Sequence, residues 1–271
     1  MTIAEPLKST NWWGKFELEE GELGHWCVGP LELWIRRANQ DWRYGSKRSE
    51  NPVENRLQVD VPWNSRGSER ALPEEEARFG VAKTGSTIEL APLLADRPVV
   101  ARPAVPFFVP PGEKVDVFLS TPLWVQLRVG KSALAEVPCF RPSDTWFGSN
   151  TRGELSYSSR THLRRNLANV EHRPHRAISC LSIENNAKEN LALERLSLPV
   201  PQLSIFASPT GSLWTEHVSV RNEEDGDLSE VSLGKGPPRE AGNGKLIAPP
   251  RSPLGRSFGS LIFGGLFEVG N

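Results

Sequence analysis

Two histidines in the second half of the chain are the residues best suited to chemistry. His172 and His175 are separated by an Arg-Pro pair. Together with a carboxylate, from Asp144 or Glu171, they would supply donors that a transition metal accepts. The intervening proline favours an extended backbone, in which residues three apart point to opposite faces. We therefore expect a metal site only if a turn brings the two histidines together, and a surface loop is the simpler interpretation.

Asp144 is the second candidate for chemistry. It lies in Ser143-Asp-Thr-Trp-Phe-Gly148, where its carboxylate could act as a general base or hydrogen-bond the local backbone in an Asx turn. No second carboxylate is near it in the sequence, so a paired acid/base assignment is not indicated. The enzyme alternative is a hydrolase acting on a glycan or a phosphorylated small molecule. Its cleft would contain Asp144, His172 and His175, with Arg173 and Arg176 holding an anion.

Dedicated catalytic motifs are missing from the sequence. There is no G-x-S-x-G elbow, and the residues before Cys139 are Val-Pro, which offer no helix start to activate a thiol. The glycines around Gly234 lack the Lys-Ser/Thr ending of a phosphate-binding loop. The sequence therefore indicates no catalytic residue, no metal and no cofactor, and it favours a non-catalytic role.

The composition is that of a turn-rich protein with little net charge. The 271 residues include 23 Gly, 23 Pro, 9 Trp and 11 Phe, and the formal net charge is −1. Glycine and proline favour turns over long helices, whereas the large rings supply core material. The balanced charge argues against a nucleic-acid binder. The segment 152–176 is basic, with six arginines against two glutamates; it could meet phosphates, an acidic partner or a membrane surface, or be a solvated face.

Three features predict a cytoplasmic protein. The first ten residues lack a basic start followed by an apolar run, so no secretory signal is expected. No window approaches the roughly 18 apolar residues of a membrane-spanning helix. Cys27, Cys139 and Cys180 are odd in number and widely spaced, so we expect buried free thiols in a reducing compartment.

Alternating apolar residues predict short strands along most of the chain. Between Trp12 and Arg36, residues 31, 33 and 35 are apolar and Gly29-Pro30 is a break, which predicts a hairpin. Further strands are expected at 57–61, 79–82, 87–94, 98–101, 115–119, 124–129, 177–183, 191–198, 203–207, 213–221 and 228–233, with turns at 110–112 and 225–227. The rest of the polar stretch 44–78 is expected to be a mobile loop. Residues 234–256 are expected to be a disordered tail, and the apolar end, 257–267, is a last strand or a docking peptide.

These elements predict an all-β protein with two packed antiparallel β-sandwich-like modules. The modules are expected at 12–137 and 138–235, followed by a Gly/Pro-rich tail at 236–271; one continuous large sandwich is the alternative. At most one short helix is expected, around 160–170. There Leu163, Leu167 and Val170 would share a helical face, with most of the arginines elsewhere.

Several blocks of the sequence resemble one protein family. They are Trp13-Gly-Lys-Phe, Ser120-Thr-Pro-Leu-Trp124, Ser143-Asp-Thr-Trp-Phe-Gly148, Pro174-His-Arg-Ala177 and Leu198-Pro-Val-Pro201. Over roughly 12–235 the chain resembles the domain-of-unknown-function 432 (DUF432) family of bacterial and archaeal proteins. The resemblance implies no activity and no catalytic residue. Because bacterial members are associated with neighbouring genes for small-conductance mechanosensitive channels, it does imply a membrane channel as a candidate partner.

The expected function is therefore that of a non-catalytic cytoplasmic accessory protein that acts through protein–protein contacts. It would reach the inner membrane through its partner, and it could also form homo-oligomers through an edge strand. The candidate partner surface consists of Trp124, Asp144, Trp146, Phe147, His172, Arg173, His175 and Arg176.

Overall fold

The structure, a computed structural model, describes residues 11–63, 75–81, 85–148, 150, 153–223, 228–253 and 260–264. These residues form strands and three-residue 3-10 helices: η1 (Leu167–Asn169), η2 (Val200–Gln202) and η3 (Arg239–Ala241). Within the same ranges, no helix has both the length and the hydrophobicity of a membrane span. The prediction of an all-β protein is confirmed.

The chain folds into two compact units. Unit 1 comprises residues 1–91 and 125–139, and unit 2 comprises residues 92–124 and 140–271. The modules expected from the sequence were continuous stretches, whereas the chain crosses between the units three times. The segment 92–124 belongs to unit 2 because its strands pair there: β8 (Val99–Pro103), β9 (Phe107–Val109) and β10 (Lys114–Pro122).

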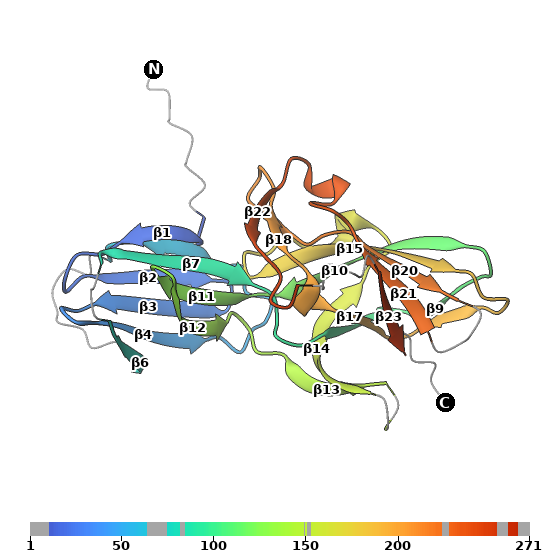
Figure 1. The fold of residues 1–271 in the computed structure, drawn as a ribbon, viewed down its shortest axis with the longest axis horizontal. Coiled ribbons are helices and arrows are strands. Elements are labelled where there is room, and N and C mark those ends of the chain that lie inside the picture. Colours follow the sequence, from blue (N-terminus) through green and yellow to red (C-terminus); the bar gives the residue numbers. More distant parts are fainter. Residues whose placement is uncertain are drawn as a thin grey trace, which may run out of the picture. The chain divides into compact units, whose positions relative to one another are not determined.

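Unit 1 consists of two antiparallel sheets (Figure 1). The first has the order β1 (Gly14–Glu17), β7 (Thr87–Leu93), β11 (Trp124–Val129), β12 (Ser132–Pro138). The second has the order β5 (Leu57–Asp60), β2 (Leu23–Val28), β3 (Leu31–Arg37), β4 (Asp41–Arg48), β6 (Glu75–Gly80). The rings of Phe16 in β1 and Trp26 in β2 meet edge-to-face, with centroids 5.3 Å apart, so apolar side chains join the two sheets.

The predicted hairpin is confirmed as β2 and β3. Val28 pairs with Leu31 across the turn, and Gly29 has a φ of 58°, which glycine adopts without strain. The predicted loop at 44–78 is wrong at both ends. β4 continues to Arg48, and β6 pairs with β4 from Glu75 onward, because backbone pairing compensates for the polar side chains. Residues 64–74 of that stretch lie outside the described residues.

The main sheet of unit 2 has eight strands around β15 (Arg176–Asn185). Its order is β22 (Lys245–Ala248), β18 (Ile205–Ala207), β19 (Leu213–Trp214), β15, β20 (Val218–Asn222), β21 (Leu228–Leu233), β23 (Ser260–Gly264), and β10 also pairs with β15. β15 pairs antiparallel with β10 but parallel with β19 and β20. The sheet is therefore mixed.

Two smaller sheets complete unit 2. One has the order β13 (Ser143–Phe147), β14 (Glu154–Leu163), β8, β17 (Leu196–Leu198), and the other pairs β16 (Leu191–Leu193) with β9. β14 and β8 are parallel. The predicted turn at 110–112 is confirmed, since the N–H of Glu113 donates to the carbonyl of Pro110 at 3.2 Å.

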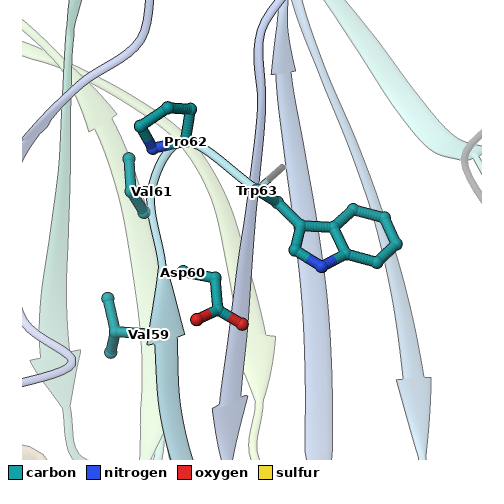
Figure 2. Close-up of a pocket in the computed structure, with 5 residues that line it drawn as sticks. All are labelled: Val59, Asp60, Val61, Pro62 and Trp63. Carbon is teal, nitrogen blue, oxygen red and sulfur yellow. The ribbon is translucent and has the colours of Figure 1, made fainter. Parts of the chain in front are cut away.

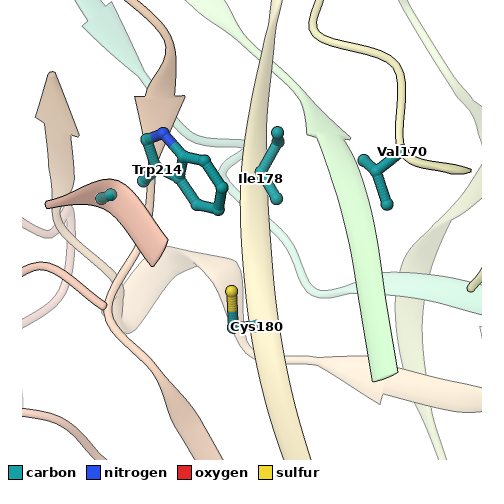
Figure 3. Packing of buried hydrophobic residues seen from close by; sticks show 5 residues of the cluster. Val170, Ile178, Cys180 and Trp214 are labelled. Atoms are coloured by element: carbon teal, nitrogen blue, oxygen red, sulfur yellow. The ribbon is translucent and has the colours of Figure 1, made fainter. Parts of the chain in front are cut away.

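The predicted disordered tail is wrong for the described residues after Gly234. β22 pairs with β18, and Arg251 Nε donates to the carbonyl of Leu94 at 2.6 Å. Ala241 of η3 is buried with Val170, Ile178, Cys180 and Trp214 (Figure 3). Residues 260–264 form β23, so this part of the apolar end is a strand. The segment is rich in Gly and Pro because it turns often while it packs against the sheet.

The helical alternative for the basic segment is not realised. β14 extends to Leu163, and only η1 is helical between 160 and 170. Leu163 and Val170 are nevertheless buried, and Leu167 packs against the cluster shown in Figure 3. The apolar spacing therefore predicted core residues correctly, although these residues lie on a strand and at a single 3-10 turn, and not on one helix. The three cysteines are free and buried, as expected.

Candidate functional site

The β13–β14 hairpin displays two large apolar side chains at the surface. Trp146 and Leu155 are directly paired across the two strands, and they are 47% and 46% exposed. β13 lies at the end of its sheet in the part of the chain that the structure describes. An edge strand with adjacent exposed apolar residues is a surface that a partner can cover.

Gly153, immediately before the hairpin's second strand, leaves space for the Trp146 indole. A Cβ at this position would collide with the indole nitrogen of Trp146 and would lie 2.6 Å from the carbonyl oxygen of Phe147. Any larger residue must therefore displace the indole or the backbone. The absent side chain at Gly153 thus determines where the exposed ring lies.

Asp144, on the same face of the hairpin, belongs to a chain of polar and aromatic contacts. Its Oδ1 accepts from Arg97 Nη1 at 3.1 Å, and the Arg97 guanidinium lies over the Tyr157 ring, 5.3 Å from its centroid. The Tyr157 hydroxyl donates to Asp96 at 3.0 Å, and its ring lies 5.8 Å from that of Trp124. Burial, aided by Asp96, raises the pKa of Tyr157. Asp144 is therefore connected to buried Trp124 through Arg97 and Tyr157.

Arg195, from the connection between β16 and β17, holds the inner side of the hairpin. Its guanidinium lies 5.2 Å from the ring centroid of buried Phe147, and its Nη2 donates to the carbonyl of Trp146 at 3.1 Å. This cation–π contact and hydrogen bond fix β13 to the connection between β16 and β17. The exposed Trp146 side chain is thus carried by an anchored backbone.

The second predicted block, His172 to Arg176, divides between surface and interior. His172 is exposed, and its ring meets that of Trp214 at 5.8 Å. Arg173 forms an ion pair with Glu171. His175 is completely buried, and its carbonyl accepts from the N–H of Leu123 at 3.0 Å.

Arg176 is also buried, and it contacts the Ser120 segment. Its Nε donates to Ser120 Oγ at 3.0 Å and its Nη2 to the Ser120 carbonyl at 2.6 Å. Burial lowers the pKa of Arg176 to about 9, and nearby Arg173 acts in the same direction. The arginine therefore carries a costly buried charge whose hydrogen bonds connect β15 to β10.

The structure thus separates the eight predicted surface residues into two sets. Asp144, Trp146 and His172 are exposed and Arg173 is half-buried, whereas the remaining four are buried: Trp124, Phe147, His175 and Arg176. Among the described residues, no group of three or more His, Cys, Asp or Glu side chains could hold a metal. The sequence did not predict a role for Leu155, Arg97 or Arg195, because only strand pairing and tertiary packing bring them to the hairpin.

The sequence also did not predict a row of polar residues that crosses neighbouring strands of the main sheet of unit 2. Asp116, Ser182 and Ser219 are register neighbours on β10, β15 and β20. The Ser182 hydroxyl donates to Asp116 at 2.5 Å and lies 3.1 Å from His217 Nε2, while Ser219 Oγ lies 3.4 Å from Nδ1. With its proton directed to Asp116, Ser182 accepts from His217. This order differs from the Ser-His-Asp order of a nucleophilic triad.

Comparison with known proteins identifies a family whose function is unknown. Neither a curated protein nor a solved structure matches the chain. The family model described as "Protein of unknown function (DUF432)" matches residues 12–267. The chain therefore belongs to the DUF432 family.

Proposed function

We propose that this chain is a non-catalytic accessory protein that binds a partner protein through the β13–β14 hairpin. The observation that supports the proposal is the exposed Trp146–Leu155 pair on an edge strand. Trp is the residue type most enriched among the energetically dominant residues of protein interfaces. The two side chains lie on an anchored backbone, so little ordering is needed on binding.

The surroundings of the pair match the usual anatomy of an interface. Asp144 and Arg97 form an exposed ion pair beside the apolar residues, and such a polar rim contributes to specificity more than to affinity. Within this proposal the protein acts in the cytoplasm and reaches the inner membrane by binding a small-conductance mechanosensitive channel. The family resemblance is the reason for choosing this class of partner.

An affinity capture tests the proposal. The tagged chain is expressed in its native cell, membranes are solubilised in mild detergent, and the captured proteins are identified by mass spectrometry. We expect a membrane channel with the native chain and its loss with the double variant Trp146→Ser, Leu155→Ser. Leu246→Ser is the matched control, because Leu246 is an exposed apolar residue of unit 2 on β22.

Two results would count against the proposal. Capture of the same partner by the double variant would remove the hairpin from the interface. A native chain that stays monomeric and does not bind channel-containing membranes would exclude the channel as the partner. Circular dichroism of each variant shows whether the β fold is retained.

A further inference from the structure

The exposed large apolar side chains of unit 1 lie at one edge of its five-stranded sheet. Among the described residues of this unit they are Val53, which is 56% exposed, and Leu57, which is 51% exposed. Leu57 begins β5, an edge strand in the part of the sheet that the structure describes, and Val53 lies in the turn before it. An edge strand with accessible apolar residues can pair with a strand of another chain.

The hydrogen bonds between β5 and β2 show which backbone groups of β5 face outward. The N–H of Gly29 donates to the carbonyl of Arg56 at 2.7 Å, so the backbone of Arg56 faces β2. Hydrogen-bonded positions alternate along an antiparallel pair, so the backbone of Gln58 also faces β2. The N–H and C=O groups of Leu57 and Val59 therefore point to the open edge of the sheet.

The side chains of β5 divide between the two faces of the sheet. Val59 pairs with Trp26, whose ring meets that of Phe16 in the other sheet of unit 1. Val59 and Leu57 are thus on the face that covers the interior of the sandwich. Figure 2 shows the side chain of Val59 on one side of the strand and the carboxylate of Asp60 on the other. A strand added at this edge would extend both the apolar face and the polar face.

The polar face of β5 carries a row of three residues with a charge at each end. Arg56 Nη2 donates to Gln58 Oε1 at 2.9 Å, and Gln58 Nε2 donates to Asp60 Oδ2 at 2.6 Å. Arg56 also forms an ion pair with Glu32 at 2.7 Å, and Asp60 pairs with His25 in the register of β2 and β5. The side chains of Arg56 and Asp60 are still 43% and 37% exposed, so both can make further contacts.

We propose that two copies of this chain pair through β5 to form a homodimer. The two strands are antiparallel, with the two-fold axis at Gln58. Leu57 of each copy lies opposite Val59 of the other, and each such pair exchanges two backbone hydrogen bonds. Arg56 of each copy lies opposite Asp60 of the other, so opposite charges meet on both sides of the axis. The edge is therefore self-complementary, as a two-fold interface requires.

The same charges disfavour the alternative arrangements of two β5 strands. A parallel pair in register would place each charged residue opposite its own copy, and like charges directly opposite are destabilising. In the antiparallel pair, a shift of two residues in one direction brings Glu54 opposite Asp60. The opposite shift brings Arg56 opposite Pro62 and removes both ion pairs. A shift of one residue would pair outward-facing backbone groups with inward-facing ones.

Sedimentation velocity of the full-length chain tests the homodimer. We expect a species of twice the mass of the chain, whose share rises with protein concentration. The hairpin variant Trp146→Ser, Leu155→Ser should form the same dimer, because these residues belong to unit 2. A native chain that is monomeric up to about 100 µM, a concentration at which even weak pairs associate, would overturn the proposal. Loss of the dimer in the hairpin variant would also overturn it.

A disulfide at the two-fold axis tests the register. Gln58 faces its own copy in a pair without mutual hydrogen bonds, where the Cα atoms are about 4.5 Å apart and a disulfide can form. Gln58→Cys should therefore cross-link two chains under mild oxidation, as seen on a non-reducing gel. Lys131→Cys, at an exposed turn of unit 1, is the control; the native cysteines are buried. Equal cross-linking of the two variants would contradict the register.

Charge variants test the pairing of Arg56 with Asp60. Arg56→Asp and Asp60→Arg each place like charges opposite each other twice in a homodimer, so we expect the dimer Kd to rise about 10-fold or more. When the two variants are mixed, the heterodimer has opposite charges in both pairs, so it should form in preference to either homodimer. Circular dichroism checks the fold of each variant. Single variants that dimerise like the native chain, or a mixture that gains no affinity, would contradict the pairing.

Discussion

Arg176 holds Ser120 with two hydrogen bonds, one to the hydroxyl at 3.0 Å and one to the carbonyl oxygen at 2.6 Å. The two residues are 56 positions apart in the sequence, yet both are buried on neighbouring strands of the main sheet of unit 2. The sequence suggested an anion-binding role for Arg176. In the structure, its guanidinium instead donates hydrogen bonds to a backbone carbonyl and a serine hydroxyl inside the core.

Replacement of Arg176 by lysine should therefore destabilise the fold. A single ammonium cannot reproduce the planar fork, so we expect the free energy of unfolding to fall by about 1–3 kcal/mol in urea titrations. Ser120→Ala removes one of the two acceptors and should cost about 1 kcal/mol. The double variant should show non-additivity of at least about 0.5 kcal/mol.

Lys235→Ala provides the control for this series, since Lys235 is exposed and a surface change is usually within about 0.5 kcal/mol of neutral. An Arg176→Lys chain as stable as this control would contradict the assigned role.

The second prediction concerns the space beside Trp146. Gly153→Ala should lower the free energy of unfolding by about 1–3 kcal/mol, because the new methyl group collides with the indole and with the Phe147 carbonyl. It should also weaken partner capture by moving Trp146. Gly85→Ala is the matched control, since a Cβ there meets nothing within 4 Å. Equal stability of the two variants in urea would show that the hairpin adapts freely.

The third prediction is a loss of stability in mild acid. Burial lowers the pKa of His25 below its ordinary value of 6.5. The unfolded chain then binds a proton more readily than the folded chain, so stability falls as pH drops from about 6.5 towards the folded-state pKa. Urea midpoints at pH 7.5 and 5.5 measure the effect.

His25→Gln should show a flatter dependence between these two pH values. Titration of Asp41 does not contribute to the pH dependence in this range. Hydrogen bonds from Arg43 and Arg78 lower the pKa of Asp41 from 3.8, so the stability that its ionised form contributes is lost only in stronger acid. A native pH dependence that persists unchanged in His25→Gln would contradict the assignment.

The fourth prediction is that the cysteines are unreactive in the native state. Burial raises the pKa of Cys27 to about 11 and that of Cys180 to about 12, and it raises the pKa of Cys139 further still. Few thiolates are therefore present at pH 7.5. Iodoacetamide should add no mass to the folded chain but three carbamidomethyl groups in urea. Lys131→Cys, at an exposed turn, should be labelled in both conditions; rapid native labelling of the wild type would contradict the burial.

The fifth prediction separates a binding protein from a serine hydrolase. Because the Ser182 proton is directed to Asp116, a fluorophosphonate probe should not modify Ser182 at neutral pH. Tryptic peptides examined by mass spectrometry give the answer, with an active serine protease as the positive control. Modification that disappears in Ser182→Ala would favour the enzyme alternative over the proposed accessory role.

Elements that depend on local sequence were the most predictable. The Gly29-Pro30 break and the alternation of Leu31, Leu33 and Ile35 determine a hairpin with one buried face, because side chains alternate along any strand. The turn at Pro110 is equally local. The buried cysteines were also predictable, since a small apolar thiol among apolar neighbours belongs in the core.

Polar segments were less predictable. Backbone pairing holds the ends of the stretch 44–78 and the residues around β22 in their sheets, and a pattern based on side chains does not detect it. The exposure of the candidate surface residues was equally hard to predict from the sequence. Trp124 and Trp146 look equivalent in sequence, but one faces the core and the other faces solvent.

The amino-acid sequence by itself determined the fold class, the hairpin at Gly29 and membership of the DUF432 family, because these depend on periodicity, turns and local motifs. Tertiary structure alone decided that Leu155 lies opposite Trp146, that Arg176 holds Ser120, and that His25 faces Asp60. Each of these pairs joins residues from different strands. Strand register is set by the packing of whole sheets, so no local pattern contains it.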